Sequence, residues 1–234
     1  MHIAIIGPPS RLRTELIDLL LHDGHTIHLD DPTSERQAFR STLVHIGAIE
    51  QRVGSEDLTI AIGSEVDEAD LQILPPSDAS IGIIVHDLVD SMTDSPWYAE
   101  ELDVSRQDAL EQADAPRTRW WVDPLDVVRA VRHLLKDPMI RSMRIDIAGR
   151  RGWSRLETTD LIRRFSRRAG AGRTGFHADV LESVEEFPRP VVVSSTNRPD
   201  LGPLNEALER ADVDGWQPTR SFRMSVMDLL AGVR

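Results

Sequence analysis

Short apolar runs of strand length recur along this chain, and the first of them, residues 2–6, ends at Gly7. A continuous apolar run of this length is typical of a strand that is buried on both faces, as in a parallel sheet. A helix is expected next, because Ser10 can cap a segment with leucines at helical spacing that stops at Gly24. Residues 26–30 are then expected to form a second strand with an acidic tip. A strand, a helix and a strand in this order restrict the chain to the α/β folds.

The alternation of strand-like and helix-like segments continues along the chain. We expect further strands at residues 58–63, 81–86 and 143–149, and helices at residues 33–53, at residues 97–112, from residue 124 and at residues 154–170. With 234 residues, 40% of them hydrophobic, the chain can form one body with a sizeable core. The predicted fold class is α/β: a Rossmann-like doubly wound parallel sheet in residues 1–138 and a small C-terminal α/β substrate-type lobe in residues 139–234, packed as one compact body.

The first strand, helix and second strand are the parts of a dinucleotide-binding unit. In such a unit, an acid at the tip of the second strand hydrogen-bonds a ribose, and the loop and helix start hold the pyrophosphate. NAD or NADP is therefore the candidate cofactor. The candidate cofactor-binding residues are Gly7, Ser10, Arg11, Arg13 and Asp30.

The loop after the first strand departs from the usual glycine-rich pattern. A G-x-x-G-x-x-G loop that starts at Gly7 needs glycines where this chain has Ser10 and Arg13. The two prolines that follow Gly7 also remove two N–H donors from the phosphate cradle. Ordinary dinucleotide binding is therefore disfavoured. The side chains of Arg11 and Arg13 offer another way to hold phosphates, and a solvated first helical turn is the alternative interpretation.

The charge and the cysteine content exclude several classes of function. With 39 acidic and 27 basic residues the net charge is −12, which disfavours nucleic acids and anionic membranes as partners. The sequence has no cysteine and therefore no disulfide, thiolate nucleophile or thiolate metal site. The N-terminal apolar run is too short for a signal peptide, and no apolar run of about 18 residues could span a bilayer. A cytoplasmic protein is expected.

Two polar patterns resemble ion sites. His22, His25 and His28 recur every third residue, but a glycine breaks the helix between the first two, so no metal site is predicted. A group of acids that includes Asp87 and Asp90 matches no metal-binding loop, and a solvated acidic face is expected there.

Sharper signals follow residue 120. Asp123 can cap a helix that begins at the next residue, a proline, and Asp126 lies near the positive end of that helix. Ser154 and Glu157 have the spacing of a capping box, which predicts a second helix start. Residues 215–218, G-W-Q-P, are expected to form a turn before a last helix.

In this order and spacing, these segments resemble the extended short-chain dehydrogenase/reductase family, particularly its nucleotide-sugar epimerases and dehydratases. Residues 122–130, with Asp126, are similar to that family's V-x-V-x-D-V-x-x-A segment. Residues 145–149 followed by Ser154 resemble its N-I-G strand and S-x-x-E helix start, and residues 215–218 resemble its G-W-x-P turn. The opening strand, helix and strand complete a resemblance that covers both ends of the chain.

The resemblance implies a catalytic pair that this chain cannot form. In the family, the lysine of a Y-x-x-x-K helix lowers the pKa of the tyrosine that transfers the proton. This chain has one tyrosine, Tyr98, and one lysine, Lys136. If Tyr98 is the family's tyrosine, Leu102 stands at the lysine position. Alternatively, the strand expected at residues 81–86 is the one that follows the catalytic helix, and that helix has been deleted. We favour the deletion, because the gap from the central strands to Trp120 is short, and in either case no catalytic residue is predicted.

The resemblance also implies a substrate-binding lobe. The family contacts the nucleotide of its sugar substrate with an R-P-x-D-like stretch, and Arg198 and Asp200 stand at the corresponding positions. Arg198 could pair with a diphosphate in bidentate fashion, and an ordinary surface arginine is the alternative. Trp120 and Trp121 are expected to pack between the lobes rather than stack on a ligand.

These observations leave three functions open. The first is a degenerate relative of this family without dehydrogenase chemistry, which binds a nucleotide-sugar or dinucleotide ligand or a protein partner. The alternative is an active NAD(P)-dependent nucleotide-sugar epimerase or dehydratase with a non-standard catalytic site, in which His86 or Asp87 at a strand end does the acid–base work. The third is a structural interaction protein whose cleft binds nothing.

Overall fold

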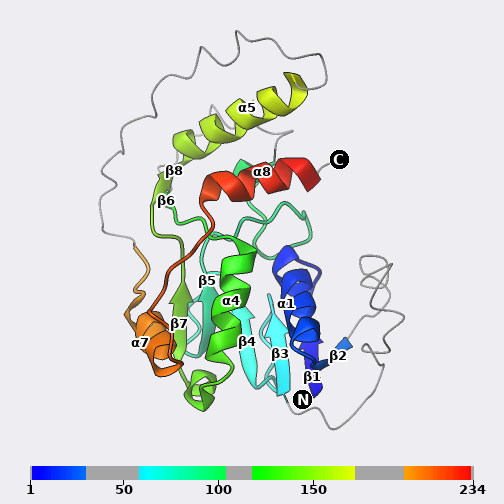
Figure 1. The fold of residues 1–234 in the computed structure, drawn as a ribbon, viewed down its shortest axis with the longest axis vertical. Coiled ribbons are helices and arrows are strands. Elements are labelled where there is room, and N and C mark those ends of the chain that lie inside the picture. The colour runs from blue at the N-terminus through cyan, green and yellow to red at the C-terminus, as the bar shows by residue number, and fades with distance from the viewer. Residues whose placement is uncertain (1, 30–57, 104–117, 172–197, 233–234) are drawn as a thin grey trace.

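A computed structural model of the chain describes residues 2–29, 58–103, 118–171 and 198–232. Its centre is a six-stranded sheet in which neighbouring strands run parallel. The strand order is β2-β1-β3-β4-β5-β7, so the chain steps from β1 to β2 on one side and then crosses to β3 on the other (Figure 1). The predicted Rossmann-like doubly wound sheet is thus confirmed.

The strands of this sheet are β1 (His2–Ile6), β2 (Thr26–Leu29), β3 (Leu58–Ile62), β4 (Leu71–Leu74), β5 (Gly82–Val85) and β7 (Arg144–Ile147). The helices that pack beside it are α1 (Arg11–His22), α4 (Pro124–Leu134) and α7 (Gly202–Arg210). A short antiparallel pair, β6 (Thr118–Arg119) and β8 (Trp153–Ser154), leads into α5 (Arg155–Ala171), and α8 (Phe222–Gly232) lies beside α5. Two 3-10 turns are η1 (Glu100–Leu102) and η3 (Pro138–Ser142).

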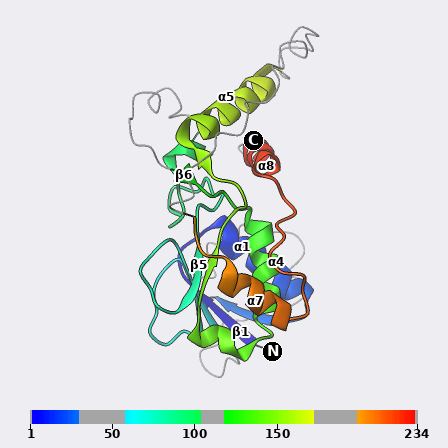
Figure 2. The same ribbon diagram turned by 90° about the vertical axis from the view of Figure 1, so that its left-hand side faces the viewer.

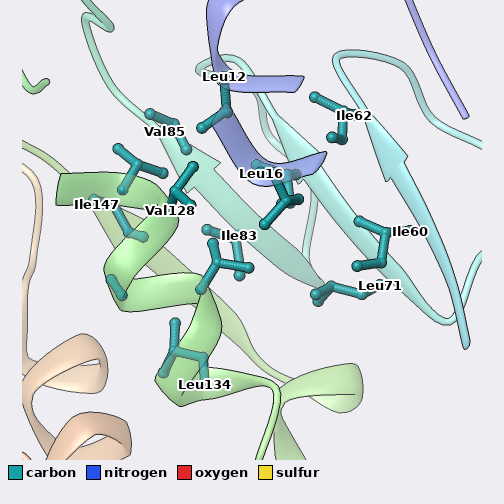
Figure 3. Packing of buried hydrophobic residues seen from close by; sticks show 14 of the residues in the cluster. Leu12, Leu16, Ile60, Ile62, Leu71, Ile83, Val85, Val128, Leu134 and Ile147 are labelled. Atoms are coloured by element: carbon teal, nitrogen blue, oxygen red, sulfur yellow. The ribbon is translucent and has the colours of Figure 1, made fainter. Parts of the chain in front are cut away.

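Helices α1 and α4 cover one face of the sheet and form the main core with it. Ser10 accepts a hydrogen bond from the backbone N–H of Arg13, and Asp123 from that of Leu125, so both helices begin with the predicted caps. Each fully buried apolar side chain contributes roughly 1.5–3 kcal/mol to this core. The residues that meet here, shown in Figure 3, include Leu12, Leu16, Ile60, Ile83, Val85, Val128 and Leu134.

The opposite face of the sheet carries no helix among the described residues. β3 connects to β4 through residues 63–70, and β4 connects to β5 through residues 75–81, both without a helix. A crossover between parallel strands usually takes about a dozen or more residues and includes a helix. These two connections are too short for one, and Figure 2 shows them as loops on the side of the sheet away from α4. The loop before β5 agrees with the alignment in which a helix is deleted there.

Polar side chains on this second face hold the loops in place of helix packing. Gln72 Nε2 donates to the carbonyl oxygen of Val66 at 3.0 Å. Arg144 Nη1 donates to the carbonyl oxygens of Ser77 at 3.0 Å and Ala79 at 2.7 Å. Such carbonyl groups have no helical partners, and each costs roughly 1–3 kcal/mol if it is buried unpaired. This arrangement explains why polar and apolar residues alternate in β7, R-I-D-I. Its isoleucines face the core, and its polar residues face the loops.

A second, smaller core joins α5 and α8 beyond the carboxyl ends of the strands (Figure 1). Trp121 stacks on Phe222 with ring centroids 5.3 Å apart, and its indole donates to Thr158 Oγ1 at 3.0 Å. The predicted capping box begins α5, because Ser154 Oγ accepts from the backbone N–H of Glu157, and the Glu157 carboxylate accepts from that of Ser154.

Some elements differ from the predictions. The sequence does not predict β4, because its four residues, L-Q-I-L, are few and include a glutamine. In the described part of the helix predicted at residues 97–112 the structure has only η1, since Trp97 is buried and its Nε1 donates to the carbonyl oxygen of Val85 at 3.0 Å. The helix predicted at residues 33–53 lies outside the described residues. β7 belongs to the main sheet, and the division of the chain at residue 138 stays a prediction.

We predict that Arg144→Met lowers the free energy of unfolding by about 1–3 kcal/mol, because it leaves the carbonyl groups of the loop before β5 without their donor. Urea denaturation of the two proteins measures the difference. Arg141→Met is the matched control, since its half-exposed guanidinium only pairs with Asp70 at 3.4 Å and should contribute less than about 1 kcal/mol. Equal effects of the two substitutions would contradict this role of Arg144.

Candidate functional site

The crevice between the carboxyl ends of β1 and β3 is the place where an open α/β sheet binds ligands, since the strand order reverses there. Gly7 follows β1 with φ +131°, and Gly63 follows β3 with φ +79°. A Cβ atom on Gly7 would lie 2.0 Å from the carbonyl oxygen of Ile62, so only glycine fits between the two loops. The loop that we predicted to bind a dinucleotide therefore borders this crevice.

A buried carboxylate occupies the start of α1. The backbone N–H of Arg11 donates to Asp90 Oδ2 at 3.0 Å, and that of Met92 donates to Asp90 Oδ1 at 3.0 Å. Asp90 is 1% exposed. A helix N-terminus carries a partial positive charge and unpaired N–H groups, which is why phosphates bind there. Here the acid from the segment after β5 takes that position, so the expectation of a solvated acidic face is wrong for Asp90.

The two arginines of the first helical turn are also engaged within the protein. Arg13 is 1% exposed, and its Nη1 donates to the carbonyl oxygen of Gly7 at 2.6 Å. The guanidinium of Arg11 lies 3.7 Å from the Glu15 carboxylate, one turn further along α1. Arg13 is therefore not a solvated residue, and it braces the loop after β1.

The segment that carries Asp90 also packs over the loop after β3. A Cβ atom on Gly63 would lie 2.4 Å from Pro96 Cγ and 3.4 Å from Pro8 Cγ. Trp97, which follows Pro96, is buried, and its indole is fixed to the end of β5 by its hydrogen bond to the carbonyl oxygen of Val85. Two proline rings thus stand at the crevice where backbone would have to approach a pyrophosphate.

A charged network links the same segment to β6 and the residue that follows it. Arg119 Nη2 donates to both carboxylate oxygens of Glu101, at 3.0 and 2.9 Å, and its Nη1 donates to Asp87 Oδ1 at 2.9 Å. Asp87 has a left-handed φ of +48°, and its Oδ2 accepts from the backbone N–H of Trp120 at 2.7 Å. Burial favours a raised pKa for Glu101, but the hydrogen bonds from Arg119 outweigh it and hold this pKa below its ordinary value. Asp87 is therefore engaged in structural contacts.

His86, the other acid–base candidate, pairs with an aspartate on the helix-free face. Its Nε2 lies 2.7 Å from Asp146 Oδ1, and Asp146 also accepts hydrogen bonds from Arg144 at 3.0 Å. Burial favours a raised pKa for Asp146, but the hydrogen bonds from His86 and Arg144 lower it below the ordinary value. The sequence analysis did not single out Asp146, although the polar alternation of β7 is a signal for it.

The single tyrosine and the single lysine do not come together as a catalytic pair. Tyr98 donates its hydroxyl hydrogen to Asp103 Oδ2 at 3.1 Å, and Leu102, four residues after Tyr98, is buried at 1% exposure. Lys136 is exposed just after α4. Tyr98 lies before a 3-10 turn rather than on a helix.

The predicted substrate-lobe residues have different surroundings. Arg198 is exposed, its guanidinium carbon lies 5.7 Å from the ring centroid of Trp120, and it has no hydrogen-bond partner among the described residues. Asp200 accepts from the backbone N–H of Gly202, the first residue of α7, at 2.9 Å. Trp120 is 9% exposed, which agrees with a packing role. Arg198 remains available to an anion, whereas the Asp200 carboxylate is engaged at the helix start.

Asp30 lies outside the described residues, so its contact with a ribose stays a prediction. Within the ranges that the structure describes, no three His, Asp or Glu residues are grouped closely enough to hold a metal ion. His28 instead lies with its Nε2 3.2 Å from His2 Nδ1. None of the described helices is both long enough and apolar enough to cross a membrane.

The fold is similar to that of several solved sugar-nucleotide enzymes. UDP-glucose 4-epimerase of Thermotoga maritima, solved with UDP-glucose, has a TM-score of 0.60 at 10% identity, covering 100% of this chain and 99% of the other. UDP-N-acetylglucosamine 4-epimerase of Bacillus cereus has a TM-score of 0.56 at 11% identity, with coverage of 100% and 99%. UDP-glucose 4-epimerase of Bifidobacterium longum, in complex with NAD+ and UDP, has 0.55 at 10% identity, with coverage of 98% and 97%.

These similarities show that the chain has the fold of these enzymes, in agreement with the fold that the sequence predicts. No protein-family model matches the chain, and no curated protein matches its sequence.

The Glu101–Arg119 ion pair should make the free energy of unfolding depend on pH. The pKa of Glu101 is lowered by folding, so its contribution to stability is present above the unfolded pKa of about 4.3 and is lost as the pH falls through the folded pKa. Glu101→Gln should lower the free energy of unfolding at pH 7 by about 3 kcal/mol, because the buried Arg119 loses one of its two carboxylate partners. Denaturant titrations from pH 7 to pH 3 should show this difference narrowing in acid.

The neighbouring Glu100→Gln is the control, because Glu100 is 48% exposed where it pairs with Arg155, so its loss should cost at most about 1 kcal/mol. A difference between Glu101→Gln and the parent that stays constant down to pH 3 would contradict the lowered pKa.

Proposed function

We propose that this protein is a degenerate relative of the nucleotide-sugar epimerases and dehydratases that binds an anionic sugar-nucleotide ligand without dehydrogenase chemistry. The observation that carries the proposal is the Asp90 carboxylate at the start of α1, 1% exposed and 3.0 Å from the backbone nitrogen of Arg11. A carboxylate in this position satisfies the helix N-terminus and repels a second anion.

Binding of a dinucleotide is opposed both by the charge of Asp90 and by the lack of free N–H donors in the loop. A pyrophosphate at α1 would displace Asp90 from the backbone N–H groups of Arg11 and Met92, and the freed carboxylate would need new partners or solvent. The N–H of Arg13 is already bonded to Ser10 Oγ at 3.1 Å. The prolines at positions 8 and 9 have no N–H to offer. The loop thus retains few of the donors with which such loops hold phosphates.

The chemistry of the family would also lack its proton carrier. The phenol of Tyr98 is bonded to Asp103, and no lysine lies near it in sequence to lower its pKa. The connection before β5, residues 75–81, has no helix on which a tyrosine and a lysine could be spaced four residues apart. The lack of a lysine near Tyr98 and the lack of a helix before β5 both favour a binding protein over an enzyme with the family's chemistry.

The ligand would contact the protein through Arg198 and the loop after β7. The backbone N–H of Gly149 donates to the carbonyl oxygen of Trp120 at 2.8 Å, so this loop lies against the tryptophan over which Arg198 sits. Arg150 and Arg151 follow directly and are exposed, and each has one protein partner: Arg150 Nη2 donates to the carbonyl oxygen of Trp216 at 3.2 Å, and Arg151 Nη2 to Glu157 Oε1 at 2.5 Å. A guanidinium with open donors suits a diphosphate, and solved proteins of this fold hold UDP-glucose or UDP. A protein that presents phosphorylated groups would use the same arginines.

One observation favours the alternative of an active epimerase or dehydratase with a non-standard catalytic site. His86 pairs with Asp146 at 2.7 Å at the end of β5, an arrangement in which a carboxylate orients an imidazole for proton transfer. This alternative requires NAD or NADP to bind beside Gly7. It predicts that the purified protein carries the cofactor and interconverts UDP-sugars, and that His86→Ala abolishes the conversion.

The ligand proposal is tested by calorimetric titration of the full chain with UDP-glucose, UDP-N-acetylglucosamine, NAD and NADP. We expect at least one UDP-sugar to bind and Arg198→Ala to weaken it about tenfold or more, the loss of one charge-assisted hydrogen bond. Arg141→Ala, which removes an exposed arginine elsewhere, should leave the affinity unchanged. Micromolar binding of NAD or NADP to the unmodified chain would overturn the proposal and favour the active enzyme.

The role of Asp90 is tested by Asp90→Ala. Removing the carboxylate should cost about 1–2 kcal/mol of stability, as for other helix caps, and should open the start of α1 to anions. Inorganic pyrophosphate should then raise the Tm of the variant by more than it raises that of the parent.

Asp94→Ala is the matched control, because Asp94 is an exposed acid of the same segment and its loss changes the net charge equally. If pyrophosphate stabilises the parent and both variants alike, Asp90 does not occupy a phosphate position.

A further inference from the structure

A second candidate site lies on the outer side of α4, away from the crevice beside Gly7. It is an open pocket of about 430 Å³ between α4, the end of α7 and the turn at residues 212–219. It shares no lining residue with the proposed sugar-nucleotide site around Arg198. A volume of several hundred Å³ is typical of small-molecule sites.

The two walls of the pocket are fixed to each other. Asp126, in the first turn of α4, accepts hydrogen bonds from the backbone N–H and the hydroxyl of Thr219, at 3.1 and 2.9 Å. Its other oxygen accepts from the backbone N–H of Arg220 at 2.9 Å. Asp126 is 3% exposed. Asp126 therefore holds the turn at residues 212–219 at a fixed distance from α4, and this distance sets the width of the pocket.

The floor of the pocket is apolar and rigid. Ala130, Leu208 and Trp216 are each less than 10% exposed and belong to the main core. The indole of Trp216 donates to the carbonyl oxygen of Ala148 at 2.8 Å, and its backbone N–H donates to Asn205 Oδ1 at 2.7 Å. These bonds hold the ring in one orientation, so an aliphatic chain can lie on the floor without rearranging it.

Arg129 presents an oriented guanidinium at one end of the turn. Its Nη1 donates to Thr219 Oγ1 at 2.7 Å and lies 3.7 Å from Asp126 Oδ1. Its Nε and Nη2 have no partner among the described residues, and the side chain is 58% exposed. The free Nε–Nη2 edge is the fork with which arginine binds a carboxylate through two parallel hydrogen bonds.

Two carboxylates stand at the other end of the turn. Asp212 and Asp214 are exposed, and neither side chain has a hydrogen bond or ion pair with the described residues. Asp212 has a left-handed φ of +59°, a conformation that costs a non-glycine residue roughly 1–2 kcal/mol. Burial and the charges of Lys136 and Arg132 lower the pKa of His133, which also lines the pocket, and so favour its neutral ring.

We propose that this pocket binds a free amino acid with a basic side chain. The α-carboxylate lies on the Nε–Nη2 edge of Arg129, the methylene chain covers Leu208 and Trp216, and the side-chain cation at the far end of that chain faces Asp212 and Asp214. The charges match, because Asp126 offsets Arg129 and leaves two uncompensated carboxylates for a ligand of net positive charge. A nucleotide sugar, with its diphosphate, has the opposite charge and does not suit this pocket.

The test is calorimetric titration of the full chain with L-lysine and L-arginine, together with two analogues. Cadaverine keeps both amines and lacks the carboxylate, and L-norleucine keeps the α-amino acid group and lacks the side-chain charge. We expect one of the basic amino acids to bind in the micromolar to low millimolar range and each analogue to bind at least about tenfold more weakly.

Variants identify the groups that make the contacts. Arg129→Gln and Asp212→Asn should each weaken the basic amino acid about tenfold or more, and asparagine tolerates the left-handed backbone at this position. Arg141→Gln and Asp67→Asn change the same charges on exposed residues that do not line the pocket, and they should leave the affinity unchanged.

The proposal is overturned if neither basic amino acid shows saturable binding, or if cadaverine binds as tightly as L-lysine and is unaffected by Arg129→Gln. Binding that survives both Arg129→Gln and Asp212→Asn also overturns it, because the ligand then lies elsewhere. Since the sugar-nucleotide proposal depends on Arg198, Arg198→Ala should not change this affinity, so the two proposals can fail separately.

Discussion

The architecture depends on the brevity of two connections. The chain passes from β3 to β4 and from β4 to β5 without room for a crossover helix, and only one face of the sheet is covered by helices among the described residues. The other face must satisfy loop carbonyl groups, which is why the polar side chains of Gln72 and Arg144 occur on that face of β4 and β7. In the alignment that we favour, the short connection before β5 also replaces the helix that, by the family resemblance, would carry the tyrosine and the lysine. The length of these two connections therefore affects both the packing of the sheet and the catalytic residues that the chain can carry.

Local signals in the sequence predicted much of the fold. The cap at Ser10, the cap at Asp123 and the capping box at Ser154 depend on residues two or three positions apart, and all three are present. Contacts between distant residues were not predictable in this way. Asp90 resembled a solvated acid because its partner, the N–H of Arg11, is 79 residues away in the sequence. Trp97 appeared to begin a helix, and its indole is instead drawn to the end of β5.

The residues of the candidate site also differ in whether the sequence could identify them. The glycine requirement after β1 follows from a strand that ends in a tight loop, and the structure places Gly7 at the crevice. Arg198 was identified by resemblance, and its exposed guanidinium is consistent with that role. The Glu101–Arg119 pair escaped notice because a buried ion pair has no local sequence pattern, and Arg119 lies in a two-residue strand. Residues that stabilise the fold through partners distant in the sequence can be recognised only in the three-dimensional structure.

The carboxylate at the start of α1 also has a consequence for the folded state in the cell. A protein that completes a helix N-terminus with a soluble nucleotide gains stability in proportion to the logarithm of the nucleotide concentration. This chain completes its helix with Asp90, a partner that is always present at fixed effective concentration. In the protein that we propose, the start of α1 is completed without a bound cofactor, so the stability of the first strand–helix unit does not depend on the concentration of a cofactor.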